Sequence, residues 1–329
     1  MKTKIVSLMM ITALILGSTI ISCKKKEVAT TPTLDAKVQQ QNTDNNNVKN
    51  ESDQADQDIN NSLGTSSMGG RIAGIASSPL CGVTIDSSQI SNKIVIFHFD
   101  STTYCFSPSR LRSGSIKVQL TTGTHWNDAG SILTLTYINF RATYPIANST
   151  NYRSVEFNGT KTLKNINGND WIGFYFNGVA LKYQERALGV QVTFVDNSTT
   201  TTATWNSARI TQWNYYGATG NPLGVPSIYW AFTSNGDTTV NGYQNTDSWG
   251  TNRYGYPFTN YYQSPWLSNT YCGLWSPTSG VLVCNVNSNN YTFTAGVDPQ
   301  GNTSTSKCAY GFKVSWQGAN STESVVISY

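Results

Sequence analysis

The 329-residue sequence predicts an all-β protein of many short antiparallel strands, arranged in a large extended or sandwich-like sheet. Three observations predict this fold class. Apolar side chains alternate with polar ones over short runs, turn residues separate the runs, and no long apolar pattern recurs at helical spacing. One face of each strand is therefore expected to be buried while the other meets water.

The alternation is clearest in four runs, where β-branched, aliphatic or aromatic side chains occupy every second position. These runs are residues 116–120, 190–194, 291–295 and 312–316. Asn-Gly pairs, which favour tight hairpin turns, punctuate the chain between such runs. Examples are Asn158-Gly159, Asn177-Gly178 and Asn235-Gly236.

The first residues carry an export signal. Lys2 and Lys4 precede an apolar stretch over residues 5–21, and Ser22-Cys23 follows it. A charged start, a short apolar core and a small residue before the cut predict a signal peptide at residues 1–22. The alternative is an uncleaved anchor helix, although the stretch is short for a membrane span.

The four residues Ile20-Ile21-Ser22-Cys23 resemble a bacterial lipobox. That resemblance implies that Cys23 carries a lipid and becomes the first mature residue, so the membrane is the predicted partner through buried acyl chains. No Asp follows Cys23 and no acidic run follows it. We therefore expect the cell envelope, on the outer membrane, with the periplasmic or surface face left open.

Residues 23–78 are expected to form a lipidated, disordered tether. Gln, Asn, Asp, Ser and Thr dominate this segment, and large apolar side chains are sparse. Such a composition buries too little surface to offset the entropy of ordering. The all-β region then covers residues 79–329, either as one domain or as two modules at about 79–214 and 215–329.

Five cysteines follow Cys23, and an exported chain is expected to oxidise them. Two stretches share one order: Cys-Gly, an apolar strand, a polar loop with a second Cys, and an alternating strand. This echo predicts the disulfides Cys81–Cys105 and Cys272–Cys308 and leaves Cys284 as a small buried apolar residue. The alternative pairs Cys284 with Cys272 or Cys308.

Several short motifs recur in an order that resembles a group of Bacteroidota cell-envelope lipoproteins without an assigned activity. The motifs are Arg110-Leu111-Arg112-Ser113-Gly114-Ser115-Ile116-Lys117-Val118, Asp128-Ala129-Gly130-Ser131, Asn158-Gly159-Thr160-Lys161-Thr162, Trp205-Asn206-Ser207-Ala208-Arg209 and Thr251-Asn252-Arg253-Tyr254-Gly255. The likeness covers most of residues 81–329. The sequence departs from the group in the aromatic segment after Tyr216 and in carrying Cys284. The resemblance implies a shared β fold and an envelope location, and it implies no activity.

The sequence offers little for catalysis, metals or cofactors. His98 and Asp100 share one strand face, but no nucleophile motif accompanies them, and His125 lies in a predicted turn. The ligand types that metals prefer are not clustered, so neither a metal nor a cofactor is expected. A net charge of +3 over residues 77–329 is too slight and dispersed for a nucleic-acid surface.

Aromatic side chains are dense between Trp213 and Trp275, interleaved with Asn, Ser, Thr and Gly. The candidate ligand-binding aromatics are Trp213, Trp230, Trp249, Tyr254, Tyr256, Trp266 and Trp275. Flat aromatic faces beside amides and hydroxyls suit sugar rings, but the same side chains also fill β cores. We therefore expect a non-enzymatic binding or structural module. The alternatives are a glycan-binding lipoprotein and a carbohydrate-active enzyme with two carboxylates facing across a groove.

Overall fold

The computed structural model describes residues 36–63, 68, 80–105, 110–145, 152–170, 173–174, 178–217, 219–273, 276–318 and 321–329. The predicted signal peptide, the predicted lipid site Cys23 and Trp275 lie outside these residues. Within them, no helix is both long and apolar enough to cross a bilayer.

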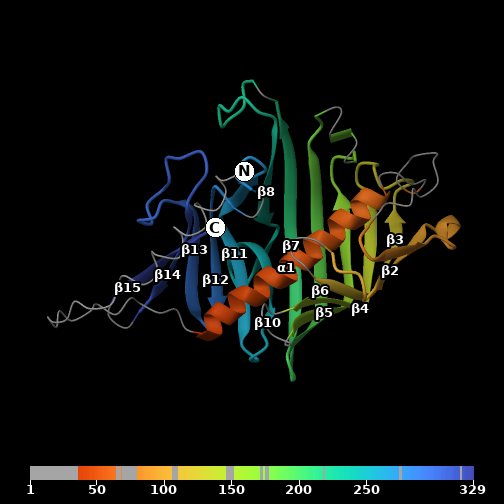
Figure 1. Cartoon of the computed structure of the whole chain (residues 1–329), viewed down its shortest axis with the longest axis horizontal. Helices are drawn as coiled ribbons and strands as arrows, with labels where there is room; N and C mark the ends of the chain where they lie inside the picture. Colours follow the sequence, from red (N-terminus) through yellow and green to blue (C-terminus); the bar gives the residue numbers. More distant parts are fainter. Residues whose placement is uncertain are drawn as a thin grey trace, which may run out of the picture. The chain divides into compact units, whose positions relative to one another are not determined.

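The described chain is built from antiparallel strands and one long helix (Figure 1). The elements are α1 (Ala36–Leu63), β1 (Val83–Asp86), the short 3-10 helix η2 (Ile90–Asn92), β2 (Ile94–Asp100), β3 (Leu111–Thr122), β4 (Ile132–Pro145), β5 (Tyr152–Asn165), β6 (Leu181–Asp196), β7 (Thr199–Tyr216), β8 (Tyr229–Gly236), β9 (Thr238–Val240), β10 (Tyr243–Thr251), β11 (Pro257–Asn269), β12 (Ser279–Val286), β13 (Asn289–Val297), β14 (Gly311–Gln317) and β15 (Thr322–Ser328).

All strands belong to one continuous sheet, which confirms the predicted all-β class. Neighbours in the sequence are mostly neighbours in space, from β1 across to β15. The order changes between β7 and β11. Both β8 and β10 lie between these two strands, one beyond the end of the other, and each pairs with a different part of β7 and of β11. The sheet runs without a break past residue 214, where a two-module division was considered.

The central strands β3 to β7 are longer than the alternating runs in the sequence suggested, because bulges interrupt the alternation. Register shifts occur at matching heights in β4, β5 and β6. Asn139 and Gly189 take positive φ angles there, and the side chains of Asn158 and Asn206 accept hydrogen bonds from their backbone amides. Each bulge shifts the alternation by one residue and keeps the same face of the strand buried.

The helix α1 lies diagonally across one face of the sheet (Figure 1), in the same compact unit, Leu34–Tyr329. The prediction of a disordered tether was therefore wrong for residues 36–63. Composition suggested disorder because apolar residues are few, but the core includes Val48, Ala55, Ile59 and Leu63 of this helix. Polar side chains of α1 are buried as well, and the sheet supplies their partners. We call the covered side of the sheet the inner face.

Candidate functional site: an acidic helix on a charged sheet face

The inner face carries charged side chains at positions where its strands otherwise place core residues. Arg112 lies on β3, Lys161 on β5, Glu185 on β6 and Arg209 on β7, and each is less than one-tenth exposed. A charge removed from water is costly unless it is paired and hydrogen-bonded. These four positions therefore require partners on whatever covers the sheet.

The helix α1 supplies those partners through a buried stripe that is largely polar. Its buried residues recur every three or four positions, as one face of a helix requires. The stripe consists of Gln41, Asp44, Val48, Glu51, Ala55, Asp58 and Ser62, flanked by Asp56, Ile59, Asn60 and Leu63. Carboxylates thus occupy positions that apolar side chains fill in an ordinary amphipathic helix.

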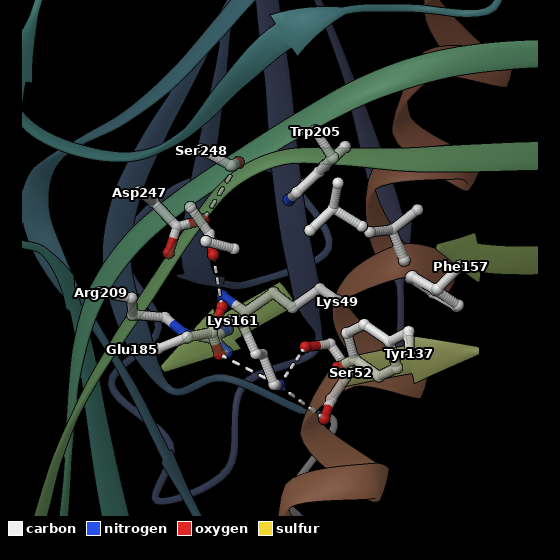
Figure 2. Close-up of a pocket in the computed structure, with 14 residues that line it drawn as sticks. Lys49, Ser52, Tyr137, Phe157, Lys161, Glu185, Trp205, Arg209, Asp247 and Ser248 are labelled. Carbon is white, nitrogen blue, oxygen red and sulfur yellow. Dashed lines mark hydrogen bonds and ion pairs between the residues drawn. The ribbon is translucent and has the colours of Figure 1, made fainter. Parts of the chain in front are cut away.

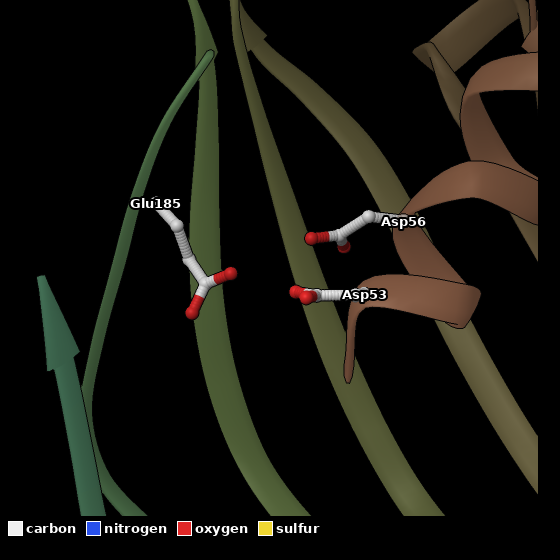
Figure 3. A group of neighbouring side chains, drawn as sticks. All are labelled: Asp53, Asp56 and Glu185. Atoms are coloured by element: carbon white, nitrogen blue, oxygen red, sulfur yellow. The ribbon is translucent and has the colours of Figure 1, made fainter. Parts of the chain in front are cut away.

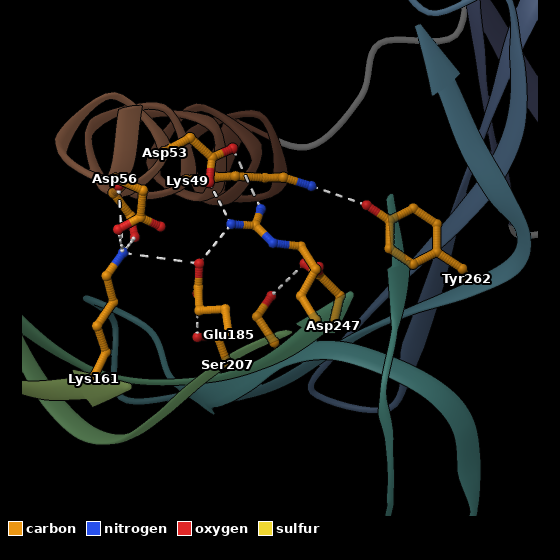
Figure 4. Close-up of polar contacts among 11 residues, drawn as sticks. Lys49, Asp53, Asp56, Lys161, Glu185, Ser207, Asp247 and Tyr262 are labelled. Atoms are coloured by element: carbon orange, nitrogen blue, oxygen red, sulfur yellow. Dashed lines mark hydrogen bonds and ion pairs between the residues drawn. The ribbon is translucent and has the colours of Figure 1, made fainter. Parts of the chain in front are cut away.

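A central cluster joins α1 to β5, β6 and β7 (Figure 4). The Lys161 ammonium lies 2.6 Å from Asp56 Oδ1 and 3.8 Å from Glu185 Oε2. Arg209 contacts Glu185 Oε2 at 2.7 Å and also pairs with Asp53. Three neighbouring strands thus present a cation, an anion and a cation. Two acids of the helix pair with the two cations.

Hydrogen bonds from small side chains complete this cluster. Ser52 of α1 accepts from the Lys161 ammonium at 2.7 Å, and Ser207 of β7 donates to Glu185 Oε1 at 2.6 Å. Multiple partners of this kind are what allow charges to remain buried together.

Two ion pairs fix the helix nearer the β3 side of the sheet. Arg112 Nη1 lies 2.5 Å from Asp58 Oδ2, and Arg110 Nε lies 3.0 Å from Glu51 Oε1. The Tyr144 hydroxyl of β4 donates to the same Glu51 carboxylate.

At the other end of α1, Arg253 follows β10 and holds Asp44. The distance from Arg253 Nη2 to Asp44 Oδ1 is 2.6 Å, and Arg253 also pairs with Asp196 at the end of β6. The guanidinium lies over the ring of Phe194 as well, 4.2 Å from its centroid. One arginine therefore ties the helix to two separate strands.

Further polar side chains of α1 have hydrogen-bond partners on the strands and loops beneath the helix. Lys49 donates to the Tyr262 hydroxyl at 2.9 Å, and Asn60 accepts from the Trp126 indole at 2.6 Å. The Asn45 amide nitrogen lies 3.8 Å from the Cys284 thiol. Cys284 is buried, and burial raises the pKa of its thiol to about 12.

Within the central cluster, the pKa values of Asp56 and Glu185 are shifted in opposite directions. Burial raises the pKa of Asp56 to about 7, despite the opposing effect of Lys161. Burial also pushes the pKa of Glu185 upward, but Arg209 and Lys161 outweigh it and bring that pKa down to about 2. Asp56 is therefore the member of the cluster that titrates near neutral pH.

Two cavities adjoin the cluster. The one in Figure 2 has a volume of about 30 Å³ and is lined by Lys161, Glu185, Arg209 and the ring of Trp205, among others. A second cavity of about 110 Å³ lies between α1 and strands β5 to β8, beside Trp213 and Phe232. Glu185 and Arg209 line both cavities and already pair with each other.

Asp53, Asp56 and Glu185 bring three carboxylate oxygens within 4.8 Å of one another (Figure 3). This spacing would suit a cation or a pair of hydrolytic acids. However, Lys161 and Arg209 already neutralise the group from within bonding distance. A metal ion would have to displace two buried cations, so the group is a structural ion-pair network.

The predicted aromatic residues do not gather on one exposed row within the described chain. Trp213 is buried, and Trp230, Tyr256 and Trp266 pack against the core. Trp249 is half-buried, whereas Tyr254 is 41 % exposed and lies near the Lys37 ammonium. Most of these side chains stabilise the sheet.

The predicted disulfides are present: Cys81 bonds Cys105, and Cys272 bonds Cys308. Among the residues that the structure describes, Cys284 is the free cysteine, and it is buried as the sequence predicted.

The two histidines are engaged by different neighbours. His98 Nδ1 lies 2.9 Å from Ser115 Oγ, while Asp100 accepts from the loop residues Thr102 and Thr103. These loop hydrogen bonds lower the pKa of Asp100 to about 2. His125 lies 3.7 Å from Asp128 in the turn after β3. The spacing of His98 and Asp100 thus reflects a strand end.

Sequence reasoning missed the helix and its ion pairs, although two signals were present. Lys161, Glu185 and Arg209 occupy positions on the buried side of their strands. The spacing of Asp44, Val48, Glu51, Ala55 and Asp58 is helical once carboxylates are counted with apolar residues. Together these signals indicate an acidic helix over a sheet face that carries cations.

No family model matches the chain, and no curated protein or solved structure is significantly similar to it.

Proposed function

We propose that this chain is a lipid-anchored protein of the bacterial cell envelope, held at the outer membrane by Cys23, whose sheet and helix form a non-enzymatic binding or structural module. The proposal of a binding or structural module rests on what the charged side chains of the inner face contact. Lys161 and Arg209 hold acids of α1, so the charged part of the inner face binds a helical segment of this same chain.

Two features support the envelope location. The lipobox-like residues before Cys23 follow a signal-peptide pattern, and the folded region contains two disulfides. Disulfides persist in oxidising compartments and are rare where thioredoxin and glutathione act.

A non-enzymatic role agrees with the state of the acids. Hydrolysis of glycosides needs one carboxyl group that donates a proton and another that acts as base or nucleophile, both facing a substrate. Asp53, Asp56 and Glu185 instead face Lys161 and Arg209 beneath the helix. Their charges are thus used to hold α1 on the sheet.

Metabolic labelling with an alkyne fatty acid tests the anchor. The wild-type chain is expected to incorporate the label and to fractionate with membranes, whereas Cys23→Ala abolishes both. Cys284→Ala is the matched control, because it removes the buried cysteine and leaves labelling unchanged. Incorporation that survives Cys23→Ala, or a full-length chain found in cytosol with reduced cysteines, contradicts the proposal.

Glycan binding is the second candidate, and one arrangement on the opposite face of the sheet favours it. Tyr243 and Tyr261 stack with 4.5 Å between ring centroids, and Trp249 lies on a neighbouring position of that face beside Asn206. These rings offer the flat faces that make apolar contacts with a sugar.

A glycan array with the wild type and Trp249→Ala tests this candidate. Binding that Trp249→Ala abolishes supports it, and Trp266→Ala, which alters a ring packed against the core near Tyr262, controls for general loss of structure. Failure of the wild type to bind any glycan removes it.

A further inference from the structure

Side chains, rather than backbone pairing, hold α1 on the sheet. Among the residues that the structure describes, no backbone hydrogen bond joins α1 to a strand. The contacts are ion pairs and side-chain hydrogen bonds that run from Asp44 to Asn60. The helix is therefore docked on the sheet in the way that a bound peptide is docked in a groove.

The helix has little stability of its own. Asn, Asp, Ser and Thr make up much of its sequence, and these residues favour turns and caps over helix interiors. Val48, Ala55, Ile59 and Leu63 are the apolar residues that it contributes to the core. Its helical form thus depends on the sheet beneath it.

The charges of the two surfaces match along the whole helix. Five acids of α1 meet five cations of the sheet and its loops. The pairs are Asp44–Arg253, Glu51–Arg110, Asp53–Arg209, Asp56–Lys161 and Asp58–Arg112. A surface that presents five cations in this order selects a helix with acids in the same order.

We infer that the inner face is a docking surface for an acidic helical segment of a partner protein, and that α1 is its resident, exchangeable occupant. The partner segment carries carboxylates at the seven-residue spacing of Asp44, Glu51 and Asp58. This inference rests on the proposed binding role and names the chemistry of the partner. Exchange replaces one set of ion pairs with an equivalent set, so the same cations are paired again when the partner segment is bound.

Cys284 provides a reporter for the exchange. Its thiol lies on the inner face against Asn45 of α1 and is 2 % exposed. The other cysteines of the folded region are in disulfides. In the full-length chain with Cys23→Ala, alkylation of Cys284 by a maleimide therefore measures how often α1 leaves the sheet.

The test uses a chain whose own helix is weakened while its sheet is unchanged. In Asp44→Lys/Asp58→Lys, two lysines face Arg253 and Arg112, so α1 undocks and alkylation of Cys284 accelerates at least about tenfold. The matched control adds the same charge on the exposed side of α1, through Thr43→Lys, Asn46→Lys, Asn50→Lys and Asn61→Lys. Its alkylation rate stays near that of the parent chain.

A synthetic peptide with the sequence of residues 36–63 is then added in trans. It is expected to bind the weakened chain saturably, by fluorescence anisotropy, and to restore protection of Cys284, whereas a scrambled peptide of identical composition does neither. Binding to the parent chain is weaker, because its own helix competes at high effective concentration.

Absence of peptide binding to the weakened chain, or equal binding of the scrambled peptide, overturns the inference. Where Asp44→Lys/Asp58→Lys does not fold, Asp44→Asn/Asp58→Asn takes its place with the same readouts. Dimerisation of the weakened chain by exchange of helices between copies, without binding of the free peptide, also overturns it. None of these results alters fatty-acid labelling at Cys23, so failure here is distinguishable from failure of the proposed anchor.

Discussion

Lys161 of β5 and Asp56 of α1 form an ion pair with 2.6 Å between Nζ and Oδ1, and both side chains are almost completely removed from solvent. The pair joins the helix to the centre of the sheet. Neither charge has water to compensate for loss of the other, so the pair behaves as a single structural unit.

Lys161→Met is expected to lower the free energy of unfolding by about 3–5 kcal/mol, because it leaves Asp56 and Glu185 buried without a shared cation. Urea unfolding at pH 7.5 measures the change. The control is Arg186→Met on the outer face, where the arginine is 42 % exposed and pairs with Asp237. Its cost should stay within about 1 kcal/mol. Equal costs would show that Lys161 is no more important than a surface charge.

Arg112 and Asp58 should show strong energetic coupling. In a double-mutant cycle with Arg112→Met and Asp58→Asn, we expect a coupling of at least about 1 kcal/mol, since either single change leaves the other group buried. Asp58→Asn with Arg253→Met, at the far end of the helix, should be additive within about 0.5 kcal/mol. Coupling that is equally large for both combinations argues against separate contacts along the helix.

Stability should depend on pH through Asp56. The pKa of this carboxyl is about 7 in the folded state against an ordinary 3.8, so between these values the folded chain binds the additional proton. The free energy of unfolding therefore rises as pH falls from 8 towards 5, by at most about 1.4 kcal/mol per pH unit from this group. Asp56→Asn should flatten that slope in urea titrations. A slope that is unchanged in the variant would assign the titration to other groups.

Burial also raises the pKa of Asp44 and Glu51, so their effect on stability has the same sign as that of Asp56. Glu185 has the opposite sign. Its pKa is lowered from 4.5 to about 2, so its favourable contribution is lost progressively as the pH falls through that range. The two effects therefore separate by pH, and measurements above pH 5 isolate the first.

Gly114 should tolerate no side chain. It has a φ of +83°, and a Cβ there would lie 2.0 Å from the Asn139 carbonyl at the β4 bulge. Gly114→Ala is expected to cost more than about 2 kcal/mol by thermal unfolding, because both backbone strain and a clash with main chain oppose it. Gly189→Ala has a similar φ but open space around the Cβ, so it isolates the strain term. Similar costs at both glycines would rule out the clash.

The sequence predicted the strands well because their alternation is local. Ile116 and Val118 are buried, and the cysteine pairs follow the repeated order of strands around them. The continuity of the sheet and the placement of the bulges depend on pairing between distant segments. Alternation within one strand does not report such pairing.

The helix was missed because the composition rule weighs apolar burial alone. In α1, carboxylates such as Glu51 and Asp58 join the apolar residues in fixing the helix to the sheet. Their partners lie more than fifty residues away in the sequence. The aromatic segment misled for the complementary reason. Trp213 and Trp266 have the amphipathic character of a sugar-binding surface, but the sheet uses them as packing.

The two disulfides bracket hairpins towards opposite margins of the sheet, with β1 and β2 inside one loop and β12 and β13 inside the other. The middle strands are clamped by ion pairs instead. Reducing agents should therefore unfold the strands within the disulfide loops first, while β5 to β7 remain paired beneath the helix. Two kinds of cross-link therefore stabilise the molecule independently. Reduction breaks the disulfides, whereas pH and ionic strength alter the ion pairs.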